Sequence, residues 1–118
     1  MKPNIFLTII AVLFAALLTY LFYAITDEPA DSAKVVIMCV SSFITFFIVI
    51  MGAIGISYPS SKLSINIGAL SALVFFLLLI IFVAMAIFMY NVAFLIIPAG
   101  LVVVIYLASV YSIIKNYQ

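Results

Sequence analysis

The sequence predicts an all-α integral membrane protein, in which four transmembrane helices form an up-down-up-down bundle within a single domain, residues 1–118. Two observations support this prediction. The chain is 71% hydrophobic and only 6% charged, whereas a soluble domain carries about 25% charged residues to cover its surface. Its charged residues also divide it into three long uncharged stretches, and about 20 helical residues suffice to cross a hydrocarbon core of about 30 Å.

The first two uncharged stretches each accommodate one helix, but the third, residues 63–114, is too long for a single span. As one helix it would measure about 78 Å at about 1.5 Å per residue, so the chain must reverse within it. A reversal at Pro98 would leave too few residues to cross the bilayer afterwards. Asn91 tolerates turn conformations and divides the stretch into two full spans. We therefore expect helices at about 5–25, 33–57, 63–89 and 92–114.

Prolines mark further features of these spans. Pro29 lies in the most polar loop and disfavours helix at the residue before it. Pro59 is expected to end the second helix at Tyr58. Pro98 and Gly100 instead fall inside the fourth helix and form a candidate helix kink, which membrane helices tolerate when neighbouring groups satisfy the freed carbonyls.

The placement of the lysines predicts the orientation of the bundle. Lys2, Lys62 and Lys115 belong to the side that holds both termini and the second loop, and only Lys34 belongs to the other side. Cytoplasmic loops carry the excess of basic residues, so we expect both termini to be cytoplasmic. The expected location is the plasma (inner) membrane of a bacterium, with the chain passing through it several times.

No predicted span contains Asp, Glu, Lys, Arg or His. Such residues inside a bilayer normally mark ion paths, proton relays or substrate sites. The length and helix count are those of small multidrug transporters, but the first helix of that family carries a membrane-embedded Glu that residues 5–25 lack. Dual-topology fluoride channels are also of this size, yet they depend on polar residues including an Arg, and this chain has none. The sequence therefore matches neither family at its diagnostic residue.

The residues that carry most enzyme chemistry are also missing. The chain has no His, and its single cysteine, Cys39, lies in an apolar run, so neither an intramolecular disulfide nor a cysteine-based metal site is possible. The acids of the 27–31 loop are expected to be solvated and to complement the start of the second helix. No nucleophile has a base within reach. We therefore expect no catalytic residue, no metal, no cofactor and, at a net charge of +1, no nucleic-acid partner.

Small and polar residues at helical spacing form the candidate site. Small residues four apart let helix backbones approach closely, and hydroxyl and amide groups hydrogen-bond across helices. Two interpretations follow: packing of the second helix against the third, or docking of a partner helix or lipid. A polar pore lining is the least supported, because the hydroxyls are few and scattered. The candidate residues are Ser42, Thr45, Gly52 and Gly55 on the second helix, with Ser64, Asn66, Gly68 and Ser71 on the third.

The function expected from these observations is non-enzymatic. The chain is interpreted as an accessory or assembly subunit of a larger membrane complex that acts through helix–helix contacts. Its partners would be membrane lipids and the helices of other membrane proteins, in a hetero-complex or a homo-oligomer. The alternative is a homo-oligomeric channel, a small transporter or a membrane-disrupting effector. The lack of charge inside the spans favours the first interpretation.

Overall fold

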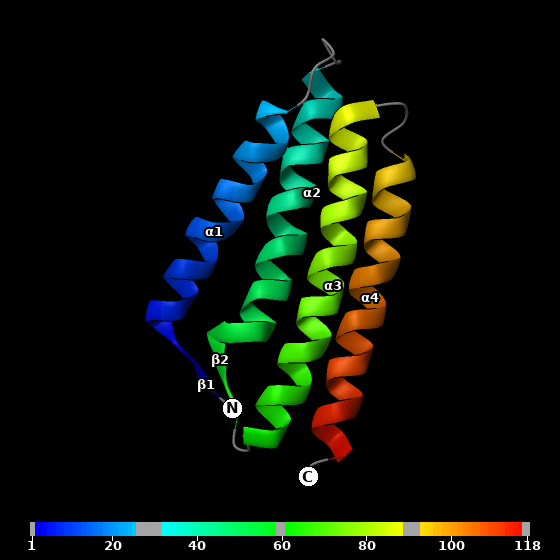
Figure 1. Cartoon of the computed structure of the whole chain (residues 1–118). Coiled ribbons are helices and arrows are strands. Elements are labelled where there is room, and N and C mark those ends of the chain that lie inside the picture. The colour runs from blue at the N-terminus through cyan, green and yellow to red at the C-terminus, as the bar shows by residue number, and fades with distance from the viewer. Residues whose placement is uncertain (1, 26–31, 59–60, 89–92, 117–118) are drawn as a thin grey trace.

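Four long helices make up most of the computed structural model, which describes residues 2–25, 32–58, 61–88 and 93–116 (Figure 1). The helices are α1 (Ile5–Ala24), α2 (Ser32–Ile50), α3 (Ser61–Phe88) and α4 (Ala93–Asn116), and α2 continues into one π-helical turn, η1 (Met51–Gly55). The prediction of an all-helical chain with four helices long and apolar enough to cross a membrane is confirmed.

The ends of the helices lie within two residues of the ranges expected from the sequence, when η1 is counted with α2. The separation of the last two helices follows the length argument, because α3 ends at Phe88 and α4 begins at Ala93. Asn91 itself lies outside the described residues. Pro98 falls within α4, and the helix runs through it.

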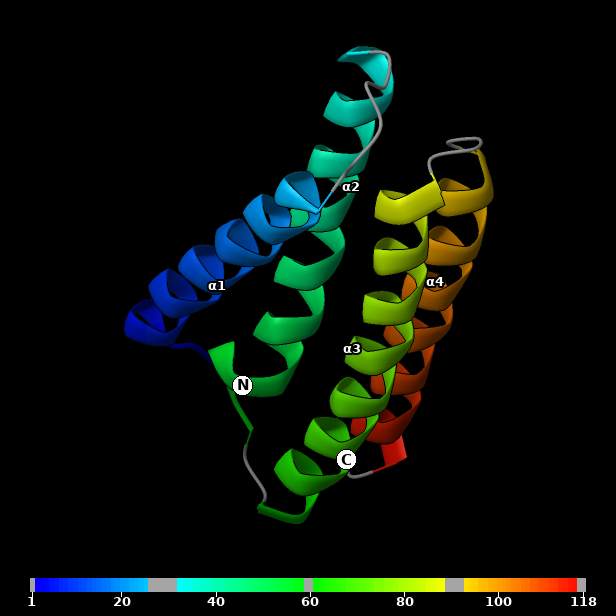
Figure 2. The ribbon, with the colours of Figure 1, turned by 45° about the horizontal axis from the view of Figure 1, so that its top comes forward.

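The helices form two hairpins, α1 with α2 and α3 with α4. α1 packs mainly against α2, and α3 mainly against α4, while α2 and η1 also contact α3 (Figures 1 and 2). Aromatic rings fill the centre, where Phe22 of α1, Phe46 of α2 and Phe82 of α3 are buried with ring centroids 5.5–5.6 Å apart. Ring pairs at this spacing contribute stability beyond their apolar area.

The end of α2 differs from the prediction that Pro59 would stop the helix at Tyr58. Helical geometry ends at Gly55, and the chain continues as a short strand, β2 (Ile56–Ser57). This strand pairs in antiparallel fashion with β1 (Lys2–Pro3), and Lys2 lies opposite Ser57. The helix therefore ends before Tyr58 because residues 2–4 offer its backbone hydrogen-bond partners in place of a further helical turn.

Asn4 links this strand pair to α1. Its backbone N–H donates a hydrogen bond of 2.8 Å to the carbonyl of Gly55, and its side-chain Oδ1 accepts one of 3.2 Å from the N–H of Leu7. The second bond is a helix N-cap, which satisfies a backbone donor that α1 cannot satisfy itself. The strand pair, the start of α3 and the end of α4 all lie at one end of the bundle (Figure 1).

Candidate functional site

Three helices meet at the side chain of Tyr106 in α4. Tyr106 is only 1% exposed, and its hydroxyl lies 2.7 Å from Oγ of Ser71 in α3. Ser71 donates its single proton to the carbonyl of Ile67 at 2.8 Å, so Tyr106 is the donor in the bond between the two side chains. This hydrogen bond ties α3 to α4 in the interior.

Gly52 of η1 completes this junction. A Cβ atom placed on Gly52 would overlap the hydroxyl of Tyr106 and would lie 3.0 Å from its Cζ. The absence of a side chain at Gly52 therefore makes room for the Tyr106 ring. The small residue thus makes room for a side chain of α4, while the backbone of η1 itself lies against α3.

Tyr58 closes the junction from the strand side. Its hydroxyl donates a 2.7 Å hydrogen bond to the carbonyl of Gly52. Burial, and to a lesser extent the neighbouring Tyr106, raise the pKa of Tyr58 above its usual value, so this phenol remains a protonated donor at neutral pH. Gly55 is also buried, and the side chain of Met51 occupies the space where its Cβ would be.

The hydroxyl-bearing candidates of α2 form hydrogen bonds with α1 or within their own helix. Ser42 is buried, and its Oγ lies 3.5 Å from Oγ1 of Thr19 in α1, at the limit for a hydrogen bond. Thr45 bonds to its own helix, through the carbonyls of Ser41 at 2.8 Å and Ser42 at 3.2 Å. Small side chains thus bring α2 close to α1, where Ala15 is fully buried.

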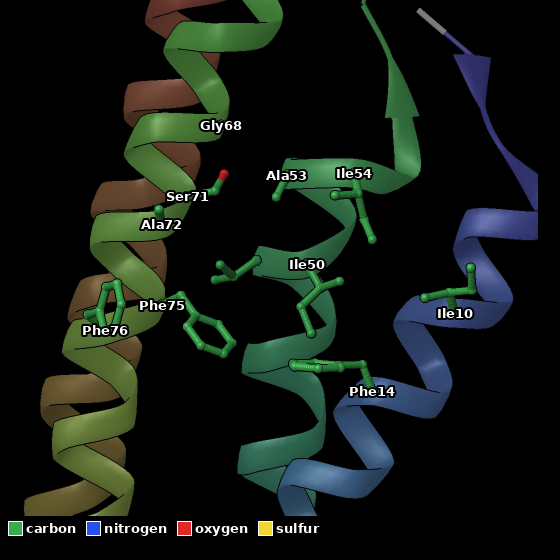
Figure 3. A pocket seen from close by; sticks show the side chains of 11 residues that line it. Ile10, Phe14, Ile50, Ala53, Ile54, Gly68, Ser71, Ala72, Phe75 and Phe76 are labelled. Atoms are coloured by element: carbon green, nitrogen blue, oxygen red, sulfur yellow. The ribbon is translucent and has the colours of Figure 1, made fainter.

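A groove of about 280 Å³ separates α3 from α1, α2 and η1 (Figure 3). Gly68 lines it, and a Cβ atom on Gly68 would have no other atom within 4 Å. Gly68 therefore borders a gap between the helices and does not lie at a contact between them, and its role in docking stays a prediction. The groove is lined by Ile10, Phe14, Val49, Ile50, Ala53, Ile54, Gly68, Ser71, Ala72, Phe75 and Phe76.

The remaining candidates lie on exposed surface. Ser64 and Asn66 are exposed on the first turns of α3. Gly100 is exposed on α4, with no other atom within 4 Å of a Cβ placed on it, and Pro98 is half-buried two residues earlier. A kink at these two residues stays a prediction.

Tyr106 is the central residue of the junction between η1, α3 and α4, and it is not among the candidates expected from the sequence. Its position inside the expected span 92–114 could have identified it, since the other tyrosines fall near the expected ends of the spans. Every buried side-chain nitrogen and oxygen within the described ranges has a hydrogen-bond partner. Over the same ranges, no three of His, Cys, Asp and Glu gather where they could hold a metal ion.

The chain matches no protein-family model, no curated protein and no solved structure. Its function must therefore be inferred from the four helices and from the contacts of their side chains.

The junction at Tyr106 predicts different effects for equivalent glycine substitutions. Gly52→Ala is expected to destabilise the protein by about 1–3 kcal/mol, because the added methyl overlaps the Tyr106 hydroxyl. Gly68→Ala and Gly100→Ala have open space and should be neutral or stabilise their helices by up to about 1 kcal/mol. Unfolding in detergent by titration with sodium dodecyl sulfate measures these differences.

A second substitution tests the cause. Tyr106→Phe removes the overlapping oxygen, so the double variant with Gly52→Ala should lose less stability than the sum of the two single variants. Strictly additive losses would show that the two residues do not contact each other in this way.

Proposed function

We propose that the protein is a multi-pass protein of the bacterial plasma membrane, with both termini cytoplasmic, and that it serves as a non-enzymatic accessory or assembly subunit of a larger membrane complex. The proposal has three parts: insertion in the membrane, absence of an ion or proton path, and a face on which a partner helix docks. Each rests on a different set of side chains.

Insertion is supported by the apolar surface of all four helices. Large aliphatic side chains are exposed on each of them, for example Ile5 on α1, Ile37 on α2, Ile80 on α3 and Ile105 on α4. Soluble monomers rarely expose continuous apolar patches larger than a few hundred Å². Lipid chains are the surroundings that suit such a surface.

The lack of an ion path is supported by the chemistry of the spans. Charged side chains lie only at the ends of the candidate spans, at Lys62 and Lys115. The buried hydroxyls of Ser71, Tyr106 and Thr45 are engaged in hydrogen bonds within the protein. An ion crosses hydrocarbon only where charges, carbonyl groups or water replace its hydration shell. Neither the groove nor the junction supplies such groups.

The proposed docking site for a partner helix is the exposed face of α4. In an 18-residue window of the span Ile97–Asn116 only 11% of the residues are buried, against 39% in a window of the same length in Val35–Gly55. Small residues, Gly100 and Ala108, are exposed on α4 among large apolar side chains, and such a surface allows a second helix to approach closely. Those large side chains are 59–68% exposed: Ile97, Leu101, Val104, Ile105 and Tyr111.

The orientation can be tested with reporter fusions. A reporter after Gln118 should be active as a cytoplasmic fusion, and one inserted between Asp27 and Ser32 should report the opposite side, because three lysines mark the end with the termini. Both reporters on one side would contradict four spans, and reversed reporters would contradict only the orientation.

The docking face can be tested by copurification. From native membranes in mild detergent, the tagged protein should retain a stoichiometric membrane-protein partner, and Gly100→Leu should reduce that retention at least fivefold by placing bulk on α4. Gly68→Leu is the matched control, since it places the same side chain on another open glycine away from this face. Equal loss from both variants, or a protein that purifies alone, would contradict docking on α4.

Purified alone and placed in liposomes, the protein should conduct no ions and drive no proton-coupled uptake, because the interior of each span holds no charge. Planar-bilayer recordings and dye-based flux assays make this measurement. Single-channel currents that disappear in Pro98→Leu would overturn the accessory-subunit proposal and support a homo-oligomeric channel with α4 at the pore.

A further inference from the structure

The groove between α3 and the first hairpin is hydrocarbon on every wall. Its walls are aliphatic and aromatic side chains together with Gly68 and the alanines. The one hydroxyl among the lining residues belongs to Ser71, and it is occupied by the carbonyl of Ile67 and the hydroxyl of Tyr106. Water would find almost no hydrogen-bond partner in such a lining. A ligand in the groove must therefore be a hydrocarbon.

The size of the groove suits a chain of several methylene groups. Its volume of about 280 Å³ is about twice the ~150 Å³ of an apolar protein cavity that holds one benzene molecule. Along α3 it extends from Gly68 to Phe76, which is about 12 Å at about 1.5 Å per residue. The groove is thus elongated along the helix direction, as the chains of a bilayer are.

One end of the groove leads to polar groups. Gly68, Ala53 and Ile54 lie at the end next to the two strands, and Phe14 and Phe76 lie toward the other end (Figure 3). On α3 the same face continues from Gly68 to Ser64 and Ser61, four and seven residues earlier, and both are exposed. Hydroxyl groups therefore follow directly where the hydrocarbon wall stops.

Positive charge gathers at this same end. Lys62 is exposed on the first turn of α3, about 9 Å along the axis from Gly68 and about 120° around the helix from it. Lys2 is exposed in β1 and pairs with Ser57. Ser57 comes three residues after Ile54, which lines the groove. All three acids of the chain belong to the segment that joins the other ends of α1 and α2. Nothing acidic in the sequence near this end offsets the two lysines.

We infer that the groove binds one acyl chain of an anionic phospholipid from the cytoplasmic leaflet, and that Lys2 and Lys62, with the hydroxyls of Ser61 and Ser64, hold its phosphate. The inference rests on the proposed insertion and orientation, which place this end at the cytoplasmic surface. Lysine side chains reach along apolar surface to the headgroup level, and anionic lipids are concentrated in that leaflet. An apolar groove that ends in hydroxyls and ammonium groups is complementary to both parts of such a lipid.

The test is a lipid titration followed by native mass spectrometry of the detergent-solubilised protein. Phosphatidylglycerol and phosphatidylcholine with identical acyl chains are the two probes. We expect one phosphatidylglycerol to be retained per chain, with an affinity well above that of phosphatidylcholine. Lys2→Gln with Lys62→Gln should weaken phosphatidylglycerol about 25-fold, or about fivefold for each lysine near the surface. Lys115 lies at the same end of the bundle but on α4, which contributes no residue to the groove, so Lys115→Gln should weaken binding by less than either Lys2→Gln or Lys62→Gln alone.

A second pair of variants tests the groove itself. Gly68→Leu fills it and should reduce retention of phosphatidylglycerol at least tenfold, while Gly100→Leu, at the other open glycine, should leave it unchanged. Thermal unfolding of both variants establishes that they are folded. Equal binding of the two lipids, retention by Gly68→Leu, or equal loss from Gly100→Leu would each overturn the inference.

The outcome for the groove is separable from that for the proposed function. Extraction of membranes with alkaline carbonate and the reporter fusions test insertion and orientation without any lipid titration. An inserted, correctly oriented protein without selective lipid retention would refute the lipid site alone. Loss of a copurifying protein from Gly68→Leu, with lipid retention intact, would assign the groove to a partner helix and overturn the inference.

Discussion

A chain that lies in hydrocarbon has no water to bond its backbone, so each N–H and C=O group must find a partner within the fold. Within the helices this requirement is met automatically, and it becomes critical where a helix stops. At the end of α2 the carbonyl of Gly55 accepts a hydrogen bond from the N–H of Asn4, and the carbonyl of Gly52 accepts one from the hydroxyl of Tyr58. The pairing of β1 with β2 and the hydrogen bond from Tyr58 thus give the backbone partners within the fold at the point where the helix ends.

The four helices and most of their ends could be predicted because the signals are local and large. A run of apolar residues bounded by charges sets a helix length, and length alone decides that the last stretch reverses before Pro98. The early end of α2 was missed for the opposite reason. Residues 2–3 and 56–57 are too few to show a strand period, and they pair across more than fifty positions of the chain. No pattern around Pro59 reveals that the chain start supplies a competing partner.

The candidate site was likewise predicted in part: its residues could be identified from the sequence, but the neighbours that they contact could not. Spacing identified Gly52, Gly68 and Ser71 as residues with small or polar side chains on helices two and three, but spacing on one helix cannot name the neighbour that each residue faces. Gly52 makes room for Tyr106 of α4, Ser71 bonds to that tyrosine, and Gly68 borders an open groove. The neighbour is a property of how the two hairpins are arranged, and that arrangement depends on the bulk of the aromatic residues at the centre.

The link between the chain start and the residues after α2 also bears on the order of biosynthesis. Ser57, the partner of Lys2, leaves the ribosome after both α1 and α2 and before any part of α3. The β1–β2 pair can therefore form, and link the start of α1 to the end of α2, while the second half of the protein is still being translated. The first half would then meet α3 as a closed pair, with Gly52 already positioned to receive the ring of Tyr106 when α4 arrives.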